Sequence, residues 1–224
     1  MSNKSTTKKK SKVAKTKITK VHDVIVLDQS GSMGSVRDAT ISMFNEQVDS
    51  ILTNSKNIDT NVSLVTFSSV VNEPTFWEEP VDKMAKLTEK DYYPSGLTAM
   101  LDAVGFVINK LRELDDADKK DVVFLVSIVS DGYENNSREH SYESIAKLIK
   151  DCEATKRWTF TYLGANQNLA DVANKMNISI NNTMKFCADS VGVKNASFAS
   201  SNMRSVMYSA YSDGDTQSDS AFEQ

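Results

Sequence analysis

The chain has 224 residues, 40% of them hydrophobic and 25% charged, which is the ordinary composition of a soluble globular protein. Its formal net charge is −4, but residues 1–20 hold eight lysines and no acid, so 18 basic and 30 acidic side chains leave about −12 on the remainder. A domain with this negative charge is unlike a typical nucleic-acid-binding domain, so only the lysine-rich tail remains as a candidate for contacts with nucleic acid.

The first predicted elements follow this tail, which is expected to be disordered over residues 1–20. An apolar, β-branched run then ends at Asp28. It predicts a buried parallel strand, because a strand covered on both faces is almost continuously hydrophobic. After Gly34 and Ser35, apolar residues at helical spacing predict a helix to about Leu52.

A second strand is expected over residues 62–67 and a third over residues 70–77. The link between them, Ser68-Ser69, is so short that it permits only antiparallel pairing. Pro74 cannot donate to a neighbouring strand, so it favours a place at the edge of the sheet.

The rest of the chain alternates between the two patterns. Helices are expected over residues 98–114, 142–154, 169–176 and 193–211, and strands over 122–129, 158–163 and 183–187. The last helix is rich in serine and asparagine, which predicts modest packing. Together the elements predict one α/β domain over residues 21–211, with a disordered acidic and serine-rich tail over 212–224.

Oxygen-bearing side chains follow the ends of the predicted strands. Asp28, Ser30 and Ser32 alternate after the first strand, and Asp131 follows the strand at 122–129. Side chains two apart in an extended segment point the same way, and ligands of such sheets bind beyond the carboxyl ends of the strands. Oxygen ligands alone suit a hard divalent cation, Mg²⁺ before most others, with Mn²⁺ or Ca²⁺ as alternatives.

These residues resemble a known metal-binding motif. The run Asp28-Gln29-Ser30-Gly31-Ser32 is similar to the D-x-S-x-S motif of von Willebrand factor type A domains, and Thr98 and Asp131 match the remaining metal positions of that family in order. The resemblance covers about residues 21–211. The sequences around Met33 and Leu163-Gly164-Ala165-Asn166-Gln167 look most like intracellular bacterial and phage members, including the tellurite-resistance-associated type.

The resemblance implies a Rossmann-like fold, with a central, mostly parallel sheet, one antiparallel edge strand and helices on both faces. It also implies a metal-ion-dependent adhesion site, MIDAS, held by Asp28, Ser30, Ser32, Thr98 and Asp131, at which a carboxylate of a partner protein completes the metal's coordination. The expected function is therefore a non-enzymatic, Mg²⁺-dependent protein-binding module. A cytoplasmic location in a bacterium or phage-infected cell is expected, with a virion as the alternative.

Two other functions remain open. A structural or assembly protein, as in a virion, would use the metal only to stabilise its fold. A Mg²⁺-dependent phosphatase of the haloacid-dehalogenase type also places an aspartate after the first strand, but it usually needs a second carboxylate two residues on, where this chain has Ser30.

Two further features bear on the environment of the protein. The longest apolar run, residues 122–129, is too short to cross a bilayer, and no apolar segment follows the first lysines as in a secretory signal. Cys152 and Cys187 lie far apart, which predicts buried, reduced thiols.

Overall fold

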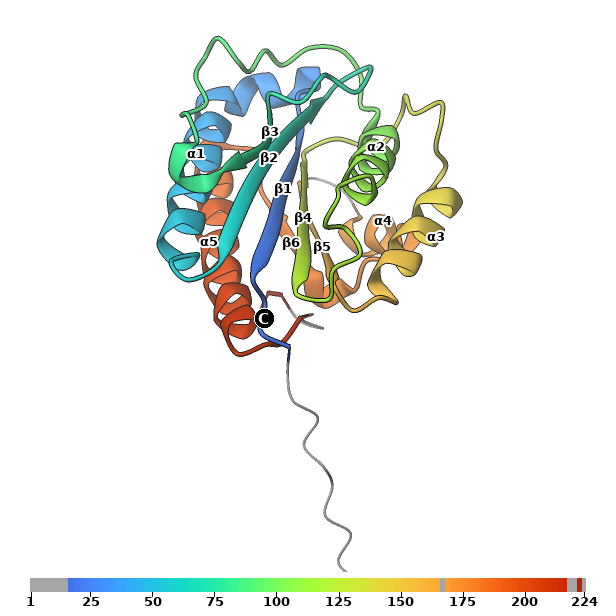
Figure 1. Ribbon diagram of the computed structural model, residues 1–224. Helices are drawn as coiled ribbons and strands as arrows, with labels where there is room; N and C mark the ends of the chain where they lie inside the picture. Colours follow the sequence, from blue (N-terminus) through green and yellow to red (C-terminus); the bar gives the residue numbers. More distant parts are fainter. Residues whose placement is uncertain (1–15, 166–167, 217–220, 223–224) are drawn as a thin grey trace, which may run out of the picture.

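The computed structural model describes residues 16–165, 168–216 and 221–222, in which a six-stranded sheet lies between two layers of helices (Figure 1). The strands are β1 (Lys20–Asp28), β2 (Asp59–Phe67), β3 (Phe76–Pro80), β4 (Val122–Ser130), β5 (Trp158–Ala165) and β6 (Thr183–Phe186). The helices are α1 (Arg37–Asn54), α2 (Met100–Arg112), α3 (Tyr142–Glu153), α4 (Leu169–Lys175) and α5 (Ser190–Ser212), with short 3₁₀ turns at Gly31–Val36, Val81–Lys83 and Ile180–Asn182.

The order of the strands is β3-β2-β1-β4-β5-β6, and all neighbours are parallel except β2 and β3. This confirms the predicted mostly parallel sheet with one antiparallel edge strand. Strands β1 and β4 lie side by side at the centre of the sheet, where helices cover both faces. Their carboxyl ends therefore open at the same edge of the sheet.

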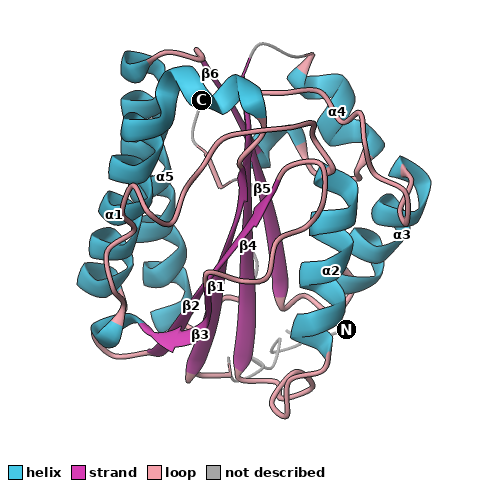
Figure 2. Ribbon diagram, turned by 90° about the horizontal axis from the view of Figure 1, so that it is seen from above, coloured by secondary structure: helices cyan, strands magenta, loops and turns pink. Residues whose placement is uncertain are grey.

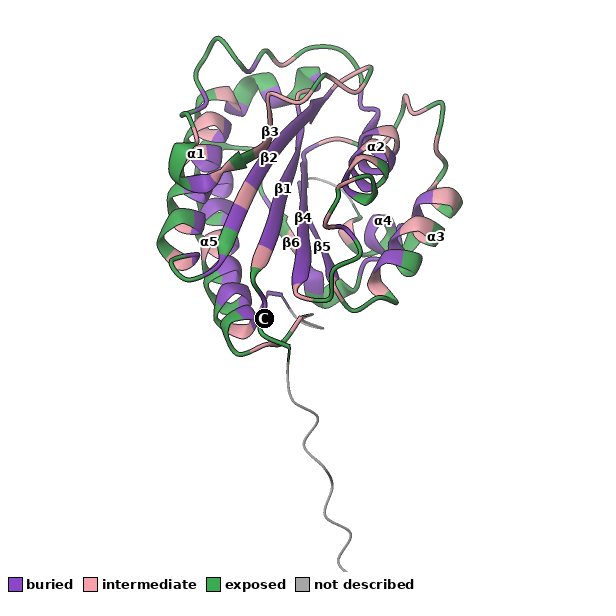
Figure 3. Cartoon of the chain, viewed as in Figure 1, coloured by how far each residue is buried: buried purple, intermediate pink, exposed green. Residues whose placement is uncertain are grey.

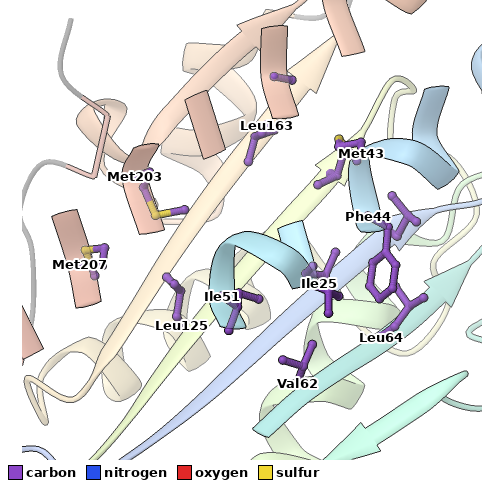
Figure 4. Close-up of a cluster of buried hydrophobic side chains, with 14 of the residues drawn as sticks. Ile25, Met43, Phe44, Ile51, Val62, Leu64, Leu125, Leu163, Met203 and Met207 are labelled. Atoms are coloured by element: carbon purple, nitrogen blue, oxygen red, sulfur yellow. The ribbon is translucent and has the colours of Figure 1, made fainter. Parts of the chain in front are cut away.

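The helices divide between the two faces of the sheet, α1 and α5 on one side and α2, α3 and α4 on the other (Figure 2). Each face has its own apolar core, and the four inner strands are buried along most of their length, unlike the edge strands β3 and β6 (Figure 3). Figure 4 shows the core under α1 and α5, where Phe44 and Ile51 of α1 and Met203 of α5 lie over Ile25 and Leu125 of the sheet. Among the described residues, no helix is long and apolar enough to span a membrane.

The edge strand begins later than the sequence predicts. Within residues 68–75, Val71 forms an isolated antiparallel bridge to Phe67 at the end of β2. The paired strand β3 starts at Phe76. Pro74, which has no N–H, lies outside the strand, as its chemistry favours. The antiparallel direction and the edge position are confirmed.

The described parts of the predicted tails contact the domain. Ile18 is 1% exposed in the core, and β1 starts at Lys20, whereas residues 1–15 lie outside the described residues. At the other end Ala221 and Phe222 are buried, and the Phe222 N–H donates to the backbone oxygen of Asn181. Residues 217–220 and 223–224 of the predicted tail lie outside the described residues.

The two cysteines differ from each other. Both are free thiols, but only Cys152 is buried, so the prediction of two buried thiols is wrong for Cys187. Cys187 directly follows the short edge strand β6, where less of the fold covers it.

The inner face of α5 packs more tightly than its polar composition predicts. Ser197 and Ser200 are buried, and their hydroxyls donate to Glu46 and Gln47 of α1 at 2.5 and 2.8 Å. Arg204 is fully buried, and its guanidinium donates to both carboxylate oxygens of Asp23 in β1 at 2.9 and 3.0 Å. The prediction of modest packing is therefore wrong for this face, because small polar side chains here satisfy a buried network.

Candidate metal centre

The five residues of the predicted metal site meet at the carboxyl edge of the sheet; together they are called the metal centre below. Asp28 is the last residue of β1, and Ser30 and Ser32 lie just beyond it. Asp131 directly follows β4, the neighbour of β1, and Thr98 lies two residues before α2. Parallel pairing sets Leu27 of β1 beside Val129 of β4, so Asp28 and Asp131 leave the sheet side by side.

Short contacts link the oxygens of the two strand ends. The Ser30 N–H donates to Asp28 Oδ1 at 2.7 Å, and the Ser30 and Ser32 hydroxyl oxygens are 3.1 Å apart. The Ser32 hydroxyl donates to Asp131 Oδ1 at 2.6 Å. The first loop and the loop after β4 are thus joined through their own oxygens, although 99 positions separate Ser32 from Asp131.

Gly132 shows how closely Thr98 approaches this group. A Cβ at position 132 would lie 3.1 Å from Thr98 Oγ1 and 3.7 Å from both Asp28 Oδ2 and Ser32 Oγ. Oxygens from all three loops therefore surround one small volume beside the Gly132 backbone. Ser32 is exposed while Asp28, Ser30 and Thr98 are buried, so the oxygens converge below an opening on the Ser32 side.

The electrostatics of the site favour a bound cation. Burial raises the pKa of Asp28 to about 6 against the lowering effect of hydrogen bonds from Ser130 and Ser30, and the charge of Asp131 adds to the rise. Burial also raises the pKa of Asp131, although the Ser32 hydroxyl opposes it. Among the described residues no lysine, arginine or histidine pairs with either carboxylate. Two adjacent, largely buried carboxylates lack a counter-charge that a divalent cation would supply.

The chemistry of the donors fits a hard metal ion. The five side chains offer two carboxylates and three hydroxyls, with no imidazole or thiolate, which is the ligand type that Mg²⁺ prefers. In the described part of the chain no group of three or more His, Cys, Asp or Glu side chains could hold a metal ion. A metal here would therefore depend on serine and threonine hydroxyls for part of its coordination.

Three supporting residues were missed by the sequence analysis. Ser130 is fully buried and donates to Asp28 Oδ2 at 2.6 Å. The Tyr92 hydroxyl donates to the backbone oxygen of Asp28 at 2.5 Å, and Asn135 Oδ1 accepts the N–H of Thr98 at 2.9 Å. Ser130 could have been found from its place, because it ends β4 in register with the end of β1.

The volume beside Gly132 gives a test of the metal centre. We expect Gly132→Ala to weaken Mg²⁺ binding roughly tenfold, because the new methyl group would crowd Thr98 Oγ1 and occupy space in contact with Asp28 Oδ2 and Ser32 Oγ. The backbone of Gly132 does not need the left-handed region, so the melting temperature without metal should change little. Calorimetric titration with Mg²⁺ measures the effect.

Gly34→Ala is the matched control, because a Cβ at that position would meet nothing within 4 Å beyond its chain neighbours and its own helical turn. Equal Mg²⁺ affinities of the two variants would contradict the placement of the metal beside Gly132.

The raised pKa of Asp28 predicts how stability without metal depends on pH. A folded-state pKa of about 6 against 3.8 in the unfolded chain stabilises the fold below pH 3.8, and this stabilisation is lost as the pH rises through 6. In EDTA we expect the free energy of unfolding to be higher at pH 5 than at pH 7.5 by about 1–2 kcal/mol. Urea unfolding at the two pH values measures the difference.

In Asp28→Asn the carboxylate is replaced by an amide of the same size, so most of this difference should disappear. An unchanged pH dependence in that variant would show that other groups cause it.

Comparison with known proteins assigns the chain to a family. The sequence profile of the von Willebrand factor type A domain matches residues 24–207, which is most of the chain. No curated protein matches the chain.

Solved structures share the fold at low sequence identity. Proximal thread matrix protein 1 from the mussel byssus, solved with a zinc-occupied MIDAS motif, matches with a TM-score of 0.56 and 14% identity over 83% of this chain and 46% of that one. The pilus adhesin SpaC from Lactobacillus rhamnosus GG matches with a TM-score of 0.59 and 12% identity over 85% and 31%. A von Willebrand factor type A structure from Catenulispora acidiphila matches with a TM-score of 0.52 and 11% identity over 84% and 42%. This chain spans less than half the length of each.

Proposed function

Because this chain belongs to the von Willebrand factor type A family, we propose that it is a non-enzymatic, metal-dependent module that captures an acidic residue of a partner protein. The observation that carries the proposal is the convergence of two carboxylates and three hydroxyls at one opening of the sheet edge, without a basic side chain paired to either carboxylate among the described residues. A divalent cation held there would supply the positive charge that attracts a carboxylate.

The residues of the metal centre have two roles in holding a cation. Asp28 and Asp131 offset the charge of a divalent cation, while Ser30, Ser32 and Thr98 add oxygen atoms without adding charge. An ion so held keeps its attraction for a further anion. Ser130 donates a hydrogen bond to the side chain of Asp28 and Tyr92 donates one to its backbone oxygen, so these two contacts orient the carboxylate at the end of β1.

Magnesium is the proposed metal, because the donors are all oxygens and small hard cations prefer them. Zinc occupies the MIDAS motif of the mussel protein, so the affinities of this protein for Mg²⁺ and Zn²⁺ should be compared by titration with each metal. The narrower resemblance to tellurite-resistance-associated, intracellular bacterial and phage proteins stays a prediction. The three structures named above are a mussel byssus protein, a pilus adhesin from Lactobacillus rhamnosus GG and a domain from Catenulispora acidiphila.

A peptide-display library tests the proposed function directly. The immobilised protein is exposed to random peptides in Mg²⁺, and bound peptides are released with EDTA. We expect the released pool to be enriched in aspartate or glutamate, and we expect Asp131→Ala to retain no such pool. A pool without acidic residues, or an equal pool from the variant, would overturn the proposal.

The same experiment distinguishes partner capture from the main alternative, a structural role of the metal. If Mg²⁺ raises the melting temperature but EDTA releases no selected peptides, the metal serves the fold alone, as expected of a structural or assembly protein.

A further inference from the structure

Large apolar side chains are exposed around the metal centre. Nine such side chains are exposed among the described residues, and four of them lie on the loops at this edge of the sheet. They are Val70 at 63% exposure, Tyr93 at 57%, Leu97 at 50% and Tyr133 at 59%, called the apolar rim below. Exposed apolar side chains gathered in one place indicate a surface that another molecule covers.

Hydrogen bonds and short stretches of backbone connect the apolar rim to the residues of the metal centre. Leu97 directly precedes Thr98, and its N–H donates to Ser69 Oγ at 2.9 Å, which ties the Val70 loop to it. On the other side, the Gln29 side chain donates to the backbone oxygen of Tyr93 at 2.8 Å. Tyr133 lies two residues after Asp131. The rim therefore holds a fixed place next to the proposed metal.

The four rim side chains carry no charge, although Glu134 follows Tyr133 directly and Glu73 lies three residues after Val70. Residues 29–35, 68–72, 92–99 and 132–133 contain no lysine, arginine, aspartate or glutamate. Arg37 lies 5.5 Å from the centre of the Tyr93 ring, but its guanidinium already donates to the backbone oxygens of Tyr92 and Glu89. The carboxylate of Glu134 accepts the backbone N–H groups of Leu101, Asn136 and Ser137, so it is engaged within the protein. A charged side chain of a partner would lose hydration against the apolar side chains of the rim, which offer it no opposite charge.

A groove continues from the rim on the side of Val70. It has a volume of about 400 Å³, and Val70, Val71 and Phe106 give it an apolar wall. Asn136 lines it as well, and the Asn136 N–H donates to the backbone oxygen of Thr98 at 3.2 Å, so the groove begins next to the metal centre. The lining of the groove also includes four charged residues, Glu73, Asp102, Arg138 and Glu139. The volume of the groove and its apolar wall suit one large apolar side chain of a partner.

We propose that the partner is a protein segment in which the acidic residue captured at the metal centre has large apolar side chains as its neighbours, and that Val70, Leu97 and the groove beside them bind one of those side chains. This inference rests on the proposed function. The partner's carboxylate makes binding depend on the metal. The uncharged apolar rim then favours those acidic segments that carry apolar neighbours. Charged or small polar neighbours of the acidic residue are disfavoured, because they leave the rim exposed or lose hydration.

The sequences of the EDTA-released peptide pool test the inference. We expect leucine, isoleucine, methionine or phenylalanine to be enriched within two positions of the acidic residue, relative to the input library. The best peptide is then synthesised with its apolar neighbour intact and with that neighbour replaced by serine or lysine. We expect each replacement to weaken Mg²⁺-dependent binding roughly tenfold or more, the loss typical of a central apolar contact.

Leu97→Ser tests the rim, with Leu52→Ser as its matched control, because Leu52 is a similarly exposed leucine at 44% on α1. We expect Leu97→Ser to weaken the apolar peptide roughly tenfold while its Mg²⁺ affinity and melting temperature stay near those of the wild type. Leu52→Ser should bind the peptide as the wild type does.

The outcomes separate this inference from the proposed function. An acid-enriched, EDTA-released pool without apolar neighbours, or equal peptide binding by Leu97→Ser and Leu52→Ser, would overturn the apolar rim and leave metal-dependent capture standing. A pool with no acidic residue would overturn both.

Discussion

Asp131→Ala is expected to abolish the stabilisation that Mg²⁺ gives the wild-type protein. A ligand that binds only the folded state at a hundred times its dissociation constant raises the free energy of unfolding by about 2.7 kcal/mol. Without Asp131 the metal centre keeps one carboxylate, and Ser32 loses the acceptor of its hydroxyl. The difference between melting temperatures in Mg²⁺ and in EDTA measures the effect, and it should fall to nearly zero.

In EDTA alone the same variant should be about as stable as the wild type. Burial raises the pKa of Asp131, so removing its carboxylate also removes a group whose charged form the fold disfavours. Asp151→Ala is the control, because it removes an exposed carboxylate from α3 with the same change in net charge. A Mg²⁺-dependent shift that persists in Asp131→Ala would show that the metal binds elsewhere.

Arg204→Met is expected to lower the free energy of unfolding by about 3–5 kcal/mol, the cost typical of breaking a buried ion pair. Both carboxylate oxygens of Asp23 accept from this guanidinium, and both residues are 0% exposed. Gln47 and Ser200 also lose a donor when the guanidinium is removed. Urea unfolding in EDTA measures the loss.

The double variant Asp23→Asn with Arg204→Met should recover part of this stability, because a neutral amide replaces the unpaired buried carboxylate. If Arg204→Met alone is neutral, the charge of Asp23 is satisfied in another way. The Mg²⁺-dependent shift should persist in Arg204→Met if the variant folds, since the Asp23–Arg204 pair does not belong to the metal centre. Asp131→Ala and Arg204→Met thus separate metal binding from fold stability.

The sequence was sufficient for the order of the elements along the chain, and it also named the five side chains that the structure brings together at the sheet edge. Both depend on local patterns. Continuous apolar runs predict β1 and β4, helical spacing predicts α2 and α3, and a polar residue at a strand end marks the edge where Asp28 and Asp131 lie. The predicted boundaries of these four elements are close to those observed because hydrophobic periodicity follows directly from burial against the sheet, whereas the edge strand β3, which is not buried, begins later than predicted.

Only the tertiary structure decided which side chains support these residues and which do not. Ser130 reaches Asp28 because the register of β4 on β1 sets the two strand ends side by side, and Arg204 pairs with Asp23 across 181 positions of sequence. The polar residues of α5 gave no sign of this, since a serine or arginine has the same local pattern whether it meets water or a buried partner. Contacts between distant segments depend on register and helix placement, which the packing of the whole chain sets, and so does the apolar rim beside the metal centre.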